Sequence, residues 1–191
     1  IVQKLGQRKK PKLLPKRKCN LSVNIALTGT PGTGKTSLSS KLNHDLVSIN
    51  DFYSEISNGK DEEGNWLIDL EKLNKVINVK IHSNTIFEGH VSHFLTNIDK
   101  IIVLRCHPNE LKERLALRDY RSEKIKENME AEALNIIAEE AIEIYGEEKV
   151  LELDTSNINI EESIEKLKDI INGNIKSDKR IDYSETIMDW Y

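Results

Sequence analysis

The chain contains one motif that constrains its fold more than any other feature, the octapeptide Gly-Thr-Pro-Gly-Thr-Gly-Lys-Thr at residues 29–36. It matches the phosphate-binding loop, in which two glycines separated by four residues precede a lysine and then a serine or threonine. Glycines let the backbone N–H groups of such a loop turn inward, in conformations that a Cβ would obstruct. An apolar run at residues 23–28 precedes the motif and a helical pattern at residues 37–44 follows it, so we expect a strand–loop–helix unit.

The residue types of this loop predict how it binds the phosphates of a nucleotide. The first N–H groups of the following helix are unpaired and carry a partial positive charge, which attracts a phosphate. Lys35 is placed to reach the β- and γ-phosphates, and the Thr36 hydroxyl is placed to ligate Mg²⁺. A glycine-rich turn that matches the pattern by chance is the alternative, and the strand and helix around the loop disfavour it. We therefore expect a nucleotide site with Mg²⁺ as its cofactor.

The composition limits the class of protein. With 191 residues, of which 38% are hydrophobic and 31% charged, the chain is long enough for one α/β domain with a buried core. No apolar run approaches the roughly 20 residues that cross a membrane, so we expect no membrane partner. The two cysteines, Cys19 and Cys106, are too few for a disulfide framework, which favours the reducing cytoplasm.

The net charge of −4 hides an uneven distribution along the chain. Residues 1–22 contain eight Lys and Arg side chains and no acid, whereas the remaining residues contain 20 basic and 32 acidic side chains and carry a charge of −12. A basic arm in front of an acidic body predicts contact with a polyanion such as ribosomal RNA. The alternative is that the arm is a solvated, disordered tail or follows a start that is not native.

Apolar runs and helical patterns alternate along the rest of the chain. Strands are expected at residues 23–28, 46–50, 84–88, 100–105 and 149–153, and helices at residues 37–44, 69–77, 108–118 and 160–171, with one long helix that ends at Gly146. This alternation predicts an α/β fold of three layers, with helices on both faces of a parallel sheet. Residues 51–65 are polar and are interrupted by two glycines, which indicates an excursion from the core.

Single residues predict where some of these helices begin, end and pack. Asp69 is expected to cap the helix at residues 69–77, because its carboxylate can accept from unpaired N–H groups. Gly173 is expected to stop the last helix. In the helix that Pro108 opens, Leu111, Leu115 and Leu117 are expected on the buried side.

A second cluster of chemically active side chains follows the strand at residues 84–88. Glu88 is expected at the carboxyl end of that strand, where α/β sheets bind their ligands. In phosphate-loop proteins, an acid on a neighbouring strand orients Mg²⁺ and its water molecules. His90 is expected to polarise the attacking group or to hydrogen-bond Glu88. The alternative is an ordinary strand-end acid with two surface histidines, His90 and His93, which alone provide too few ligands for a typical metal site.

Three arginines, Arg114, Arg118 and Arg121, lie in or next to a charged stretch that follows the helix at residues 108–118. Phosphoryl transfer spreads negative charge over equatorial oxygens, and guanidinium groups stabilise this charge. A charged segment between two helices is also suited to close over a nucleotide and exclude water. We expect Arg118 above all to contact phosphate; the alternative is a solvated helix end paired with nearby acids.

These motifs in combination resemble one known family. Residues 25–32, the run Glu-Gly-His-Val-Ser-His at residues 88–93, and Arg118-Asp119-Tyr120 with residues 127–132 are similar to the atypical adenylate kinase family, also called the adenylate kinase isoenzyme 6 family. The sequence Asp-Tyr-Ser-Glu at residues 182–185 is most similar to its archaeal branch. The resemblance covers the chain after its basic arm, which lies outside the family pattern.

The resemblance implies a phosphate-loop nucleoside monophosphate kinase fold, whose five-stranded parallel sheet has the order 2-3-1-4-5. It also implies transfer of phosphate from ATP to AMP, some ATPase activity, and a role in late maturation of the small ribosomal subunit, where the family binds a platform ribosomal protein. Two other functions remain open: a ribosome-assembly ATPase switch whose kinase activity is incidental, and a phosphate-loop kinase that acts on a non-nucleotide alcohol. The Glu-Gly-His run and the end of the chain argue against the non-nucleotide kinase.

Carried over residue by residue, the resemblance implies an ATP site, an AMP site and a metal site. The ATP contacts are Gly29, Gly32, Thr33, Gly34, Lys35, Thr36, Ser37 and Arg118, and the AMP contacts are Asn50, Asp51, Gly89 and His90. The implied catalytic residues are Lys35, Glu88, His90 and Arg118, and Mg²⁺ is held by Thr36 and, through water, by Glu88. The chain departs from the family at Glu88, where many members carry Asp, and at Ser54, where some carry an Arg for the monophosphate.

The implied domain organisation is simple. Residues 1–22 form the basic arm, residues 23–175 the kinase domain, and residues 176–191 a tail that docks on the body. Within the kinase domain, residues of about 50–66 bind the monophosphate and residues of about 117–127 form the lid.

Overall fold

The computed structural model describes residues 23–79, 84–175 and 180–190. Its strands are β1 (Ile25–Gly29), β2 (Asp45–Ser48), β3 (Ser57–Lys60), β4 (Trp66–Ile68), β5 (Thr85–Glu88), β6 (Lys100–Arg105) and β7 (Val150–Asp154). Its α-helices are α1 (Lys35–Ser39), α2 (Tyr53–Ile56), α3 (Leu70–Asn78), α4 (Pro108–Ala116), α5 (Ser122–Ala133), α6 (Ile136–Tyr145) and α7 (Ile160–Asn172). Short 3₁₀ helices lie at η1 (Ile49–Phe52), η2 (Ser92–Phe94), η3 (Glu147–Lys149) and η4 (Ser184–Trp190). The basic arm lies outside the described residues.

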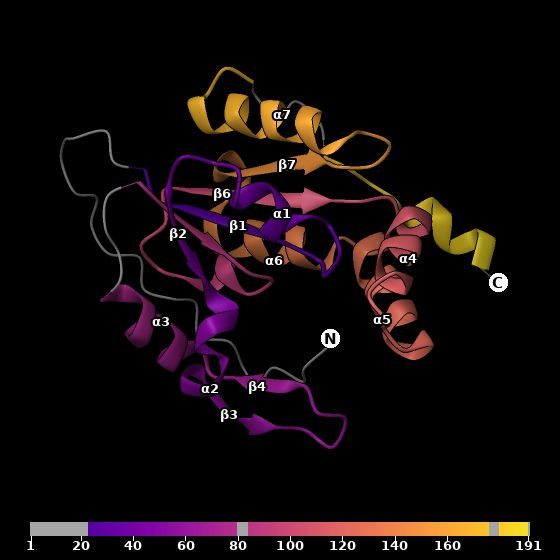
Figure 1. The fold of residues 1–191 in the computed structure, drawn as a ribbon, viewed down its shortest axis with the longest axis horizontal. Coiled ribbons are helices and arrows are strands. Elements are labelled where there is room, and N and C mark those ends of the chain that lie inside the picture. Colours follow the sequence, from indigo (N-terminus) through magenta and orange to yellow (C-terminus); the bar gives the residue numbers. More distant parts are fainter. Residues whose placement is uncertain (1–22, 80–83, 176–179, 191) are drawn as a thin grey trace.

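Five parallel strands form the central sheet, in the order β2-β5-β1-β6-β7 (Figure 1). Ile25 of β1 pairs with Ile86 of β5 on one side and with Lys100 of β6 on the other. The prediction of an α/β fold with a five-stranded parallel sheet is confirmed. The numbering of the strands differs from the expected 2-3-1-4-5, because β3 and β4 intervene along the chain and form an antiparallel hairpin of their own. When only the strands of the large sheet are numbered, β5 is the third, β6 the fourth and β7 the fifth strand. The order of the sheet is then 2-3-1-4-5.

Helices cover both faces of the sheet and bury two apolar cores. On one face, Leu38 of α1, Leu42 of the turn after it and Leu167 of α7 form a core with the strand residues Ile25 and Leu27. The opposite face packs against α2, α3 and α6 through the buried side chains Ile56, Leu73, Ile77, Ala138 and Ala141. The near-continuous apolar sequence of β6 follows from its position between the two cores, since a parallel strand covered on both faces buries side chains on both, and only Lys100 of β6 is not fully buried.

The expected helices are present, with three corrections, the first of which is that α1 ends at Ser39 although the sequence pattern predicted a helix to residue 44. Asp69 caps α3 by accepting hydrogen bonds from the backbone N–H groups of Glu71 and Lys72, and Gly173 ends α7 in a left-handed conformation. Leu117 is 87% exposed rather than buried, because α4 ends at Ala116 and the chain turns away from the core there.

The expected long helix before Gly146 is two helices, α5 and α6. The chain breaks at Asn135, whose φ of 56° places it in the left-handed region. Arg105 makes this break possible, since its guanidinium donates to the Asn135 side chain and to the carbonyl of Glu132. The break therefore depends on a tertiary contact that the local sequence does not indicate.

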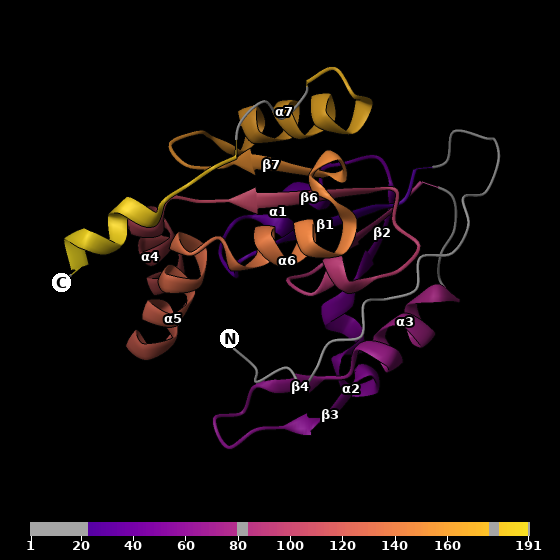
Figure 2. The same cartoon turned by 180° about the vertical axis from the view of Figure 1, so that it is seen from behind.

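The excursion at residues 51–65 contains more regular structure than its polar sequence predicts. It begins within η1, continues through α2 and enters the hairpin of β3 and β4, which extends away from the main sheet (Figure 1). The described part of the C-terminal tail contains η4, which lies beside α5 in both views (Figure 2). Among the residues described, no helix combines the length and apolar character needed to cross a membrane.

Candidate active site

The phosphate-binding loop connects β1 to α1 at the carboxyl edge of the sheet. Gly29 has a φ of 137°, and a Cβ there would collide with the carbonyl oxygen of Leu104. Gly32 has a φ of 97°, and its Cβ would lie 2.7 Å from the Leu111 side chain in α4. The loop thus runs so close to β6 and α4 that these two positions require glycine.

Lys35 lies inside this loop and is largely buried. Its ammonium donates hydrogen bonds to the carbonyl oxygens of Gly29, at 2.8 Å, and Thr30, at 3.0 Å. Burial lowers the pKa of Lys35 to about 8, and the negative charges of Glu88 and Glu132 oppose this shift. At neutral pH, Lys35 is therefore mostly an ammonium held among the loop carbonyls. In weakly basic solution a large fraction of its side chains loses the proton.

Glu88 ends β5, directly beside the first turn of α1. The hydroxyl of Thr36 donates to one Glu88 carboxylate oxygen at 3.3 Å, and the hydroxyl of Ser48 donates to the other at 2.6 Å. The Glu88 side chain is buried, so its carboxylate is held in one place by these two hydroxyl groups. Carboxylate and hydroxyl oxygens are ligands that Mg²⁺ accepts, usually with water and phosphate oxygens completing its shell. Within the described ranges, no group of three or more His, Cys, Asp or Glu side chains forms a metal site by itself.

His90 lies just beyond Glu88 and faces the excursion. Its Nδ1 lies 2.9 Å from the hydroxyl of Tyr53 in α2, and the two rings meet edge to face with centroids 5.9 Å apart. Burial lowers the pKa of His90 to about 3, and the charge of Lys35 adds to this effect. His90 is therefore a neutral imidazole at physiological pH. One of its two expected roles was a hydrogen bond to Glu88, but its hydrogen bond goes to Tyr53 instead.

His93 has a different position from His90. It is buried beneath the sheet edge, where its Nδ1 lies 3.0 Å from the Thr28 hydroxyl and its Nε2 lies 3.3 Å from a carboxylate oxygen of Glu140. These contacts tie β1 to α6. The alternative interpretation of His93 as a surface histidine is wrong, because the turn after β5 directs its side chain into the protein.

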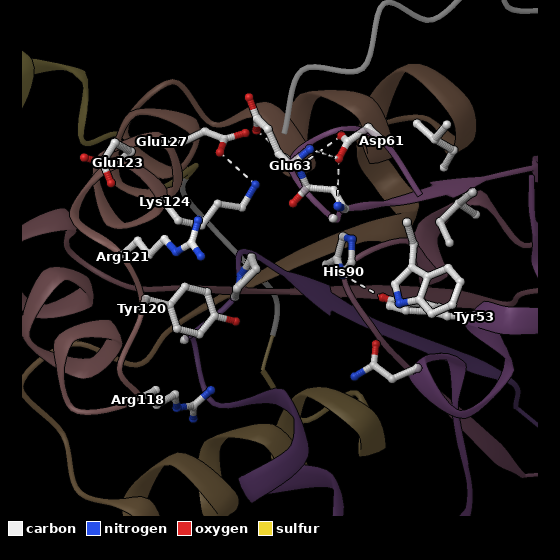
Figure 3. Close-up of a pocket in the computed structure, with 18 of the residues that line it drawn as sticks. Tyr53, Asp61, Glu63, His90, Arg118, Tyr120, Arg121, Glu123, Lys124 and Glu127 are labelled. Carbon is white, nitrogen blue, oxygen red and sulfur yellow. Dashed lines mark hydrogen bonds and ion pairs between the residues drawn. The ribbon is translucent and has the colours of Figure 1, made fainter. Parts of the chain in front are cut away.

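A cleft of about 1810 Å³ opens beside the phosphate-binding loop. It is bounded by the loop, by the excursion with its hairpin, and by the segment that leads into α5. Figure 3 shows Arg118, Tyr120 and Arg121 along one side and Tyr53 with His90 on the other. The residues of the three boundaries that line it include Gly32, Lys35, Thr36, Asn50, Tyr53, Asp61, Glu63, Trp66, His90, Arg118, Arg121 and Lys124.

A smaller cavity of about 320 Å³ lies on the other side of the loop, beside Ser37. Arg118 is exposed and, like Gly32 and Gly34 of the loop, lines both cavities. The lining of the smaller cavity is partly apolar, with Leu117 and Ile158 among its residues. This arrangement suits a flat aromatic ring next to the loop and a phosphate chain along it.

The three arginines of the charged stretch divide into two groups. Arg118 and Arg121 line the large cleft. Arg114 instead donates to Glu110 at 2.6 Å and to the carbonyl oxygen of Thr155 at 2.7 Å, which fixes α4 to the loop after β7. Arg114 is thus held by structural contacts, although one edge of it borders the smaller cavity.

The residues expected to bind AMP are only partly brought together. Asn50 and His90 line the large cleft. Asp51 is exposed and is not among the residues that line the cleft. Gly89 is buried against η1, where a Cβ would lie 3.0 Å from the Ile49 side chain, so it allows a close approach of the chain rather than forming a wall of the cleft.

Several cleft residues lie within the expected monophosphate-binding and lid segments but were not singled out from the sequence. Tyr53 and Trp66 form an aromatic corner, with ring centroids 6.5 Å apart, and the Lys60 ammonium lies 4.4 Å above the Trp66 ring. Lys124 faces the cleft from α5 and forms an ion pair with Glu127 at 2.7 Å (Figure 3). In the sequence, the only indication of these residues is that two aromatic side chains flank a polar turn. This pattern does not distinguish a cleft from a solvated loop.

The fold, the loop and the acid beside it define a protein with the phosphate-loop kinase fold. The AAA domain family matches residues 25–135. A Pyrococcus abyssi protein named "Putative adenylate kinase" is 37% identical over 171 residues, covering 87% of this chain and 90% of that protein. Proteins of the same name are 41% identical over 172 residues in Archaeoglobus fulgidus, covering 87% and 90%, and 44% identical over 144 residues in Methanococcus maripaludis, covering 69% and 79%. The chain belongs to this family of archaeal proteins.

Solved structures show the same fold in more distant proteins. A shikimate kinase from Acinetobacter baumannii in complex with shikimate has a TM-score of 0.55 at 14% identity, covering 81% of this chain and 95% of that one. A thymidylate kinase from Candida albicans has a TM-score of 0.53 at 14% identity, covering 80% and 92%. These likenesses extend the fold assignment and carry no information on substrate.

Proposed function

We propose that the protein is a nucleoside monophosphate kinase that transfers the γ-phosphate of ATP to AMP and forms two ADP. One observation carries this proposal: the cleft beside the loop extends continuously from Lys35 to the aromatic corner at Tyr53 and Trp66. A donor triphosphate on the loop and an acceptor nucleotide on the aromatic side can therefore occupy one space. The family name of the archaeal relatives supports the same activity.

The donor nucleotide occupies the loop and the smaller cavity. Its phosphates lie along the backbone N–H groups of residues 29–36, and Lys35 neutralises their charge. Its base lies in the cavity beside Ser37, against the Arg118 guanidinium, which can also contact the transferred phosphate. Thr33 and Gly34 border this cavity as well.

The hydroxyl of Thr36 and the carboxylate of Glu88 are the oxygen groups that would hold Mg²⁺ here, Thr36 directly and Glu88 through water. Bound there, the ion would neutralise charge on the phosphate oxygens. The chain's own residues orient the reactants: Lys35 and Arg118 stabilise the charge that develops on the transferred group, and neutral His90 donates or accepts a hydrogen bond without adding charge. An AMP phosphate oxygen forms the new bond to the γ-phosphorus, and the bond to the ADP leaving oxygen breaks.

Two segments complete the site. The segment at about residues 50–66, which includes α2 and the hairpin, binds the monophosphate. The segment at about residues 117–127 forms the lid that closes over ATP. Both border the large cleft: the hairpin lines it with the acids Asp61 and Glu63, and the lid lines it with Arg121 and Lys124 beside the acids Glu123 and Glu127 (Figure 3). Closure that brings these segments together excludes water from the reaction and limits ATP hydrolysis to a side activity.

A second function, an ATPase switch in small-subunit maturation that binds a platform ribosomal protein, follows from the resemblance to the isoenzyme 6 family. The observation that favours it is the charge of −12 outside the basic arm, which complements a basic ribosomal protein. A pull-down of small-subunit proteins with ATP, ADP or neither tests it. Enrichment that depends on the nucleotide supports a switch, and no enrichment under any condition contradicts it.

A coupled assay of ADP formation tests the main proposal. ADP should form from MgATP much faster when AMP is present, and faster with AMP than with CMP, GMP or UMP. Lys35→Ala should abolish transfer while the protein stays folded, and Glu88→Gln should lower kcat more than MgATP affinity, since its carboxylate acts beside the phosphates. If no monophosphate increased the rate of ADP formation, the protein would be an ATPase rather than a monophosphate kinase. Full activity of a folded Lys35→Ala variant would contradict the assignment of the phosphate-binding loop.

A further inference from the structure

Arg105 is a buried charge at the end of β6, and its contacts join segments that lie far apart in the sequence. Its Nε donates to the Glu132 carboxylate of α5 at 2.8 Å, and one terminal nitrogen forms an ion pair with Glu152 of β7. The same nitrogen donates to the carbonyl oxygen of Ile181, at 2.9 Å, in the C-terminal tail. The nearby acids raise the pKa of Arg105 against the effect of burial.

Glu132 extends these contacts to the phosphate-binding loop. One carboxylate oxygen accepts from Arg105 and from the backbone N–H of Cys106, at 3.1 Å. The other accepts a hydrogen bond from the hydroxyl of Thr30, the second residue of the loop. Thr30 also provides one of the two carbonyl oxygens that hold the Lys35 ammonium. Glu132 thus fixes the loop residue on which Lys35 rests.

The tail closes the network from the opposite side. The Tyr183 ring lies 5.3 Å from the Arg105 guanidinium and meets His107 edge to face, with centroids 5.4 Å apart. Arg180 forms an ion pair with Glu139 of α6. The tail passes over β7 and places η4 beside α5 (Figures 1 and 2). We refer to Thr30, Arg105, Glu132, Glu152 and Tyr183 as the Arg105 network.

Buried charges need all of their partners. A buried ion pair that loses one partner leaves a charge without compensation, and the remaining groups then rearrange or admit water. In the Arg105 network, the tail provides the Ile181 carbonyl and covers the guanidinium with the Tyr183 ring. Removing that cover exposes Arg105, weakens its hold on Glu132 and loosens Thr30.

We propose that Tyr183 and the described tail, residues 180–190, are positioning elements of the active site, which act through Arg105 and Glu132 on the phosphate-binding loop. Tyr183 lines neither cavity, so its effect on the loop is indirect. Its hydroxyl also lies 3.5 Å from the Ser156 hydroxyl, next to Thr155, which donates to the Thr33 carbonyl. Tyr183→Phe removes only this hydroxyl and therefore separates that contact from the one with Arg105. The inference concerns the conformation of the loop; only its kinetic readout rests on the proposed kinase function.

Hydrogen–deuterium exchange of the full chain tests the conformational part without any assumption about activity. Tyr183→Ala should speed exchange of the loop at residues 29–36 and of α5 by roughly 2- to 30-fold, the range of such indirect couplings. Tyr183→Phe, which keeps the ring over Arg105, should restore wild-type exchange. Met188→Ala is the matched control, because Met188 lies in the same tail and is 82% exposed. The proposal would be overturned if Tyr183→Ala did not change the exchange rate of the loop. It would also be overturned if exchange in β1 and β6 increased as much as exchange in the loop.

Kinetics test whether the effect passes through Thr30. Tyr183→Ala and Thr30→Val should each lower kcat several-fold, and the double variant should be no slower than the worse single variant, since both break one chain of contacts. If the loss of kcat in the double variant equalled the product of the losses in the two single variants, the two residues would act independently and the proposal would be overturned. If the wild-type protein showed no phosphoryl transfer at all, the proposed function would fail, while the exchange experiment would still decide the role of the tail.

Discussion

The hydroxyl of Tyr53 and Nδ1 of His90 lie 2.9 Å apart, joining the excursion to the segment that follows Glu88, the acid at the end of β5. Burial raises the pKa of Tyr53, with the charge of Glu88 contributing, and burial lowers the pKa of His90. Both groups are therefore neutral across the physiological range, and a single hydrogen is shared between them. When Tyr53 donates it, the His90 proton resides on Nε2, so one contact defines both the tautomer and the position of the imidazole.

Tyr53→Phe keeps the ring and removes this hydrogen bond. A typical hydrogen bond contributes about 1 kcal/mol, so we expect kcat to fall roughly fivefold, with MgATP affinity unchanged. Tyr145→Phe is the matched control, because the Tyr145 hydroxyl is buried without a hydrogen-bond partner among the described residues and lies in α6, outside the cleft. Steady-state kinetics with both substrates varied measure the effect. Equal kcat values for Tyr53→Phe and wild type would show that His90 does not depend on Tyr53.

The lowered pKa of His90 has a consequence for stability in acid. Its pKa is about 3 in the folded protein and 6.5 in an unperturbed side chain, so the unfolded chain binds the additional proton between these values. The free energy of unfolding therefore decreases as pH falls from about 6.5 towards 3. His90→Gln removes this contribution, so the variant should lose less stability than wild type between pH 7 and pH 4.5. Urea unfolding at both pH values measures this difference, and equal losses would contradict it.

The sequence was sufficient for the elements whose cause is local. The loop motif, the apolar run of β6 and the cap at Asp69 are each determined by neighbouring residues, and each lies where it was expected. Glu88 was placed correctly at the end of a strand, because the carboxyl ends of parallel strands share one edge of the sheet.

Features with a tertiary cause were not accessible from the sequence. The break at Asn135 depends on Arg105, which lies thirty residues away and donates to its side chain. The hairpin of β3 and β4 contains a short polar strand without apolar alternation, so its pairing gave no periodic signal. Arg114 and His93 were recognisable as charged or titratable side chains, but only the fold determines that they bind Thr155 and Thr28 rather than face the cleft.

Lys35 provides a prediction for proton uptake. Its pKa of about 8 means that a substantial fraction of its side chains is neutral at pH 8.5. A triphosphate bound beside it stabilises the ammonium, so binding at that pH should be accompanied by proton uptake. Calorimetric titration with MgATP in two buffers of different ionisation enthalpy measures the proton count. Uptake should approach zero at pH 6.5, where Lys35 is already charged, and should be absent in Lys35→Met at both pH values; uptake that persists in the variant would assign it to another group.

Trp66 offers a direct test of the acceptor site. It lines the large cleft on the hairpin, next to Tyr53 and beneath Lys60, so a base bound there lies against its indole. AMP should therefore quench tryptophan fluorescence, and Trp190→Phe, which removes the other tryptophan of the chain, should retain this quenching. Trp66→Leu should abolish it and raise the KM for AMP about fivefold, since an aromatic contact contributes about 1 kcal/mol beyond burial, while kcat at saturating AMP stays within about twofold. Quenching that survives in Trp66→Leu, with an unchanged KM, would place the acceptor base elsewhere in the cleft.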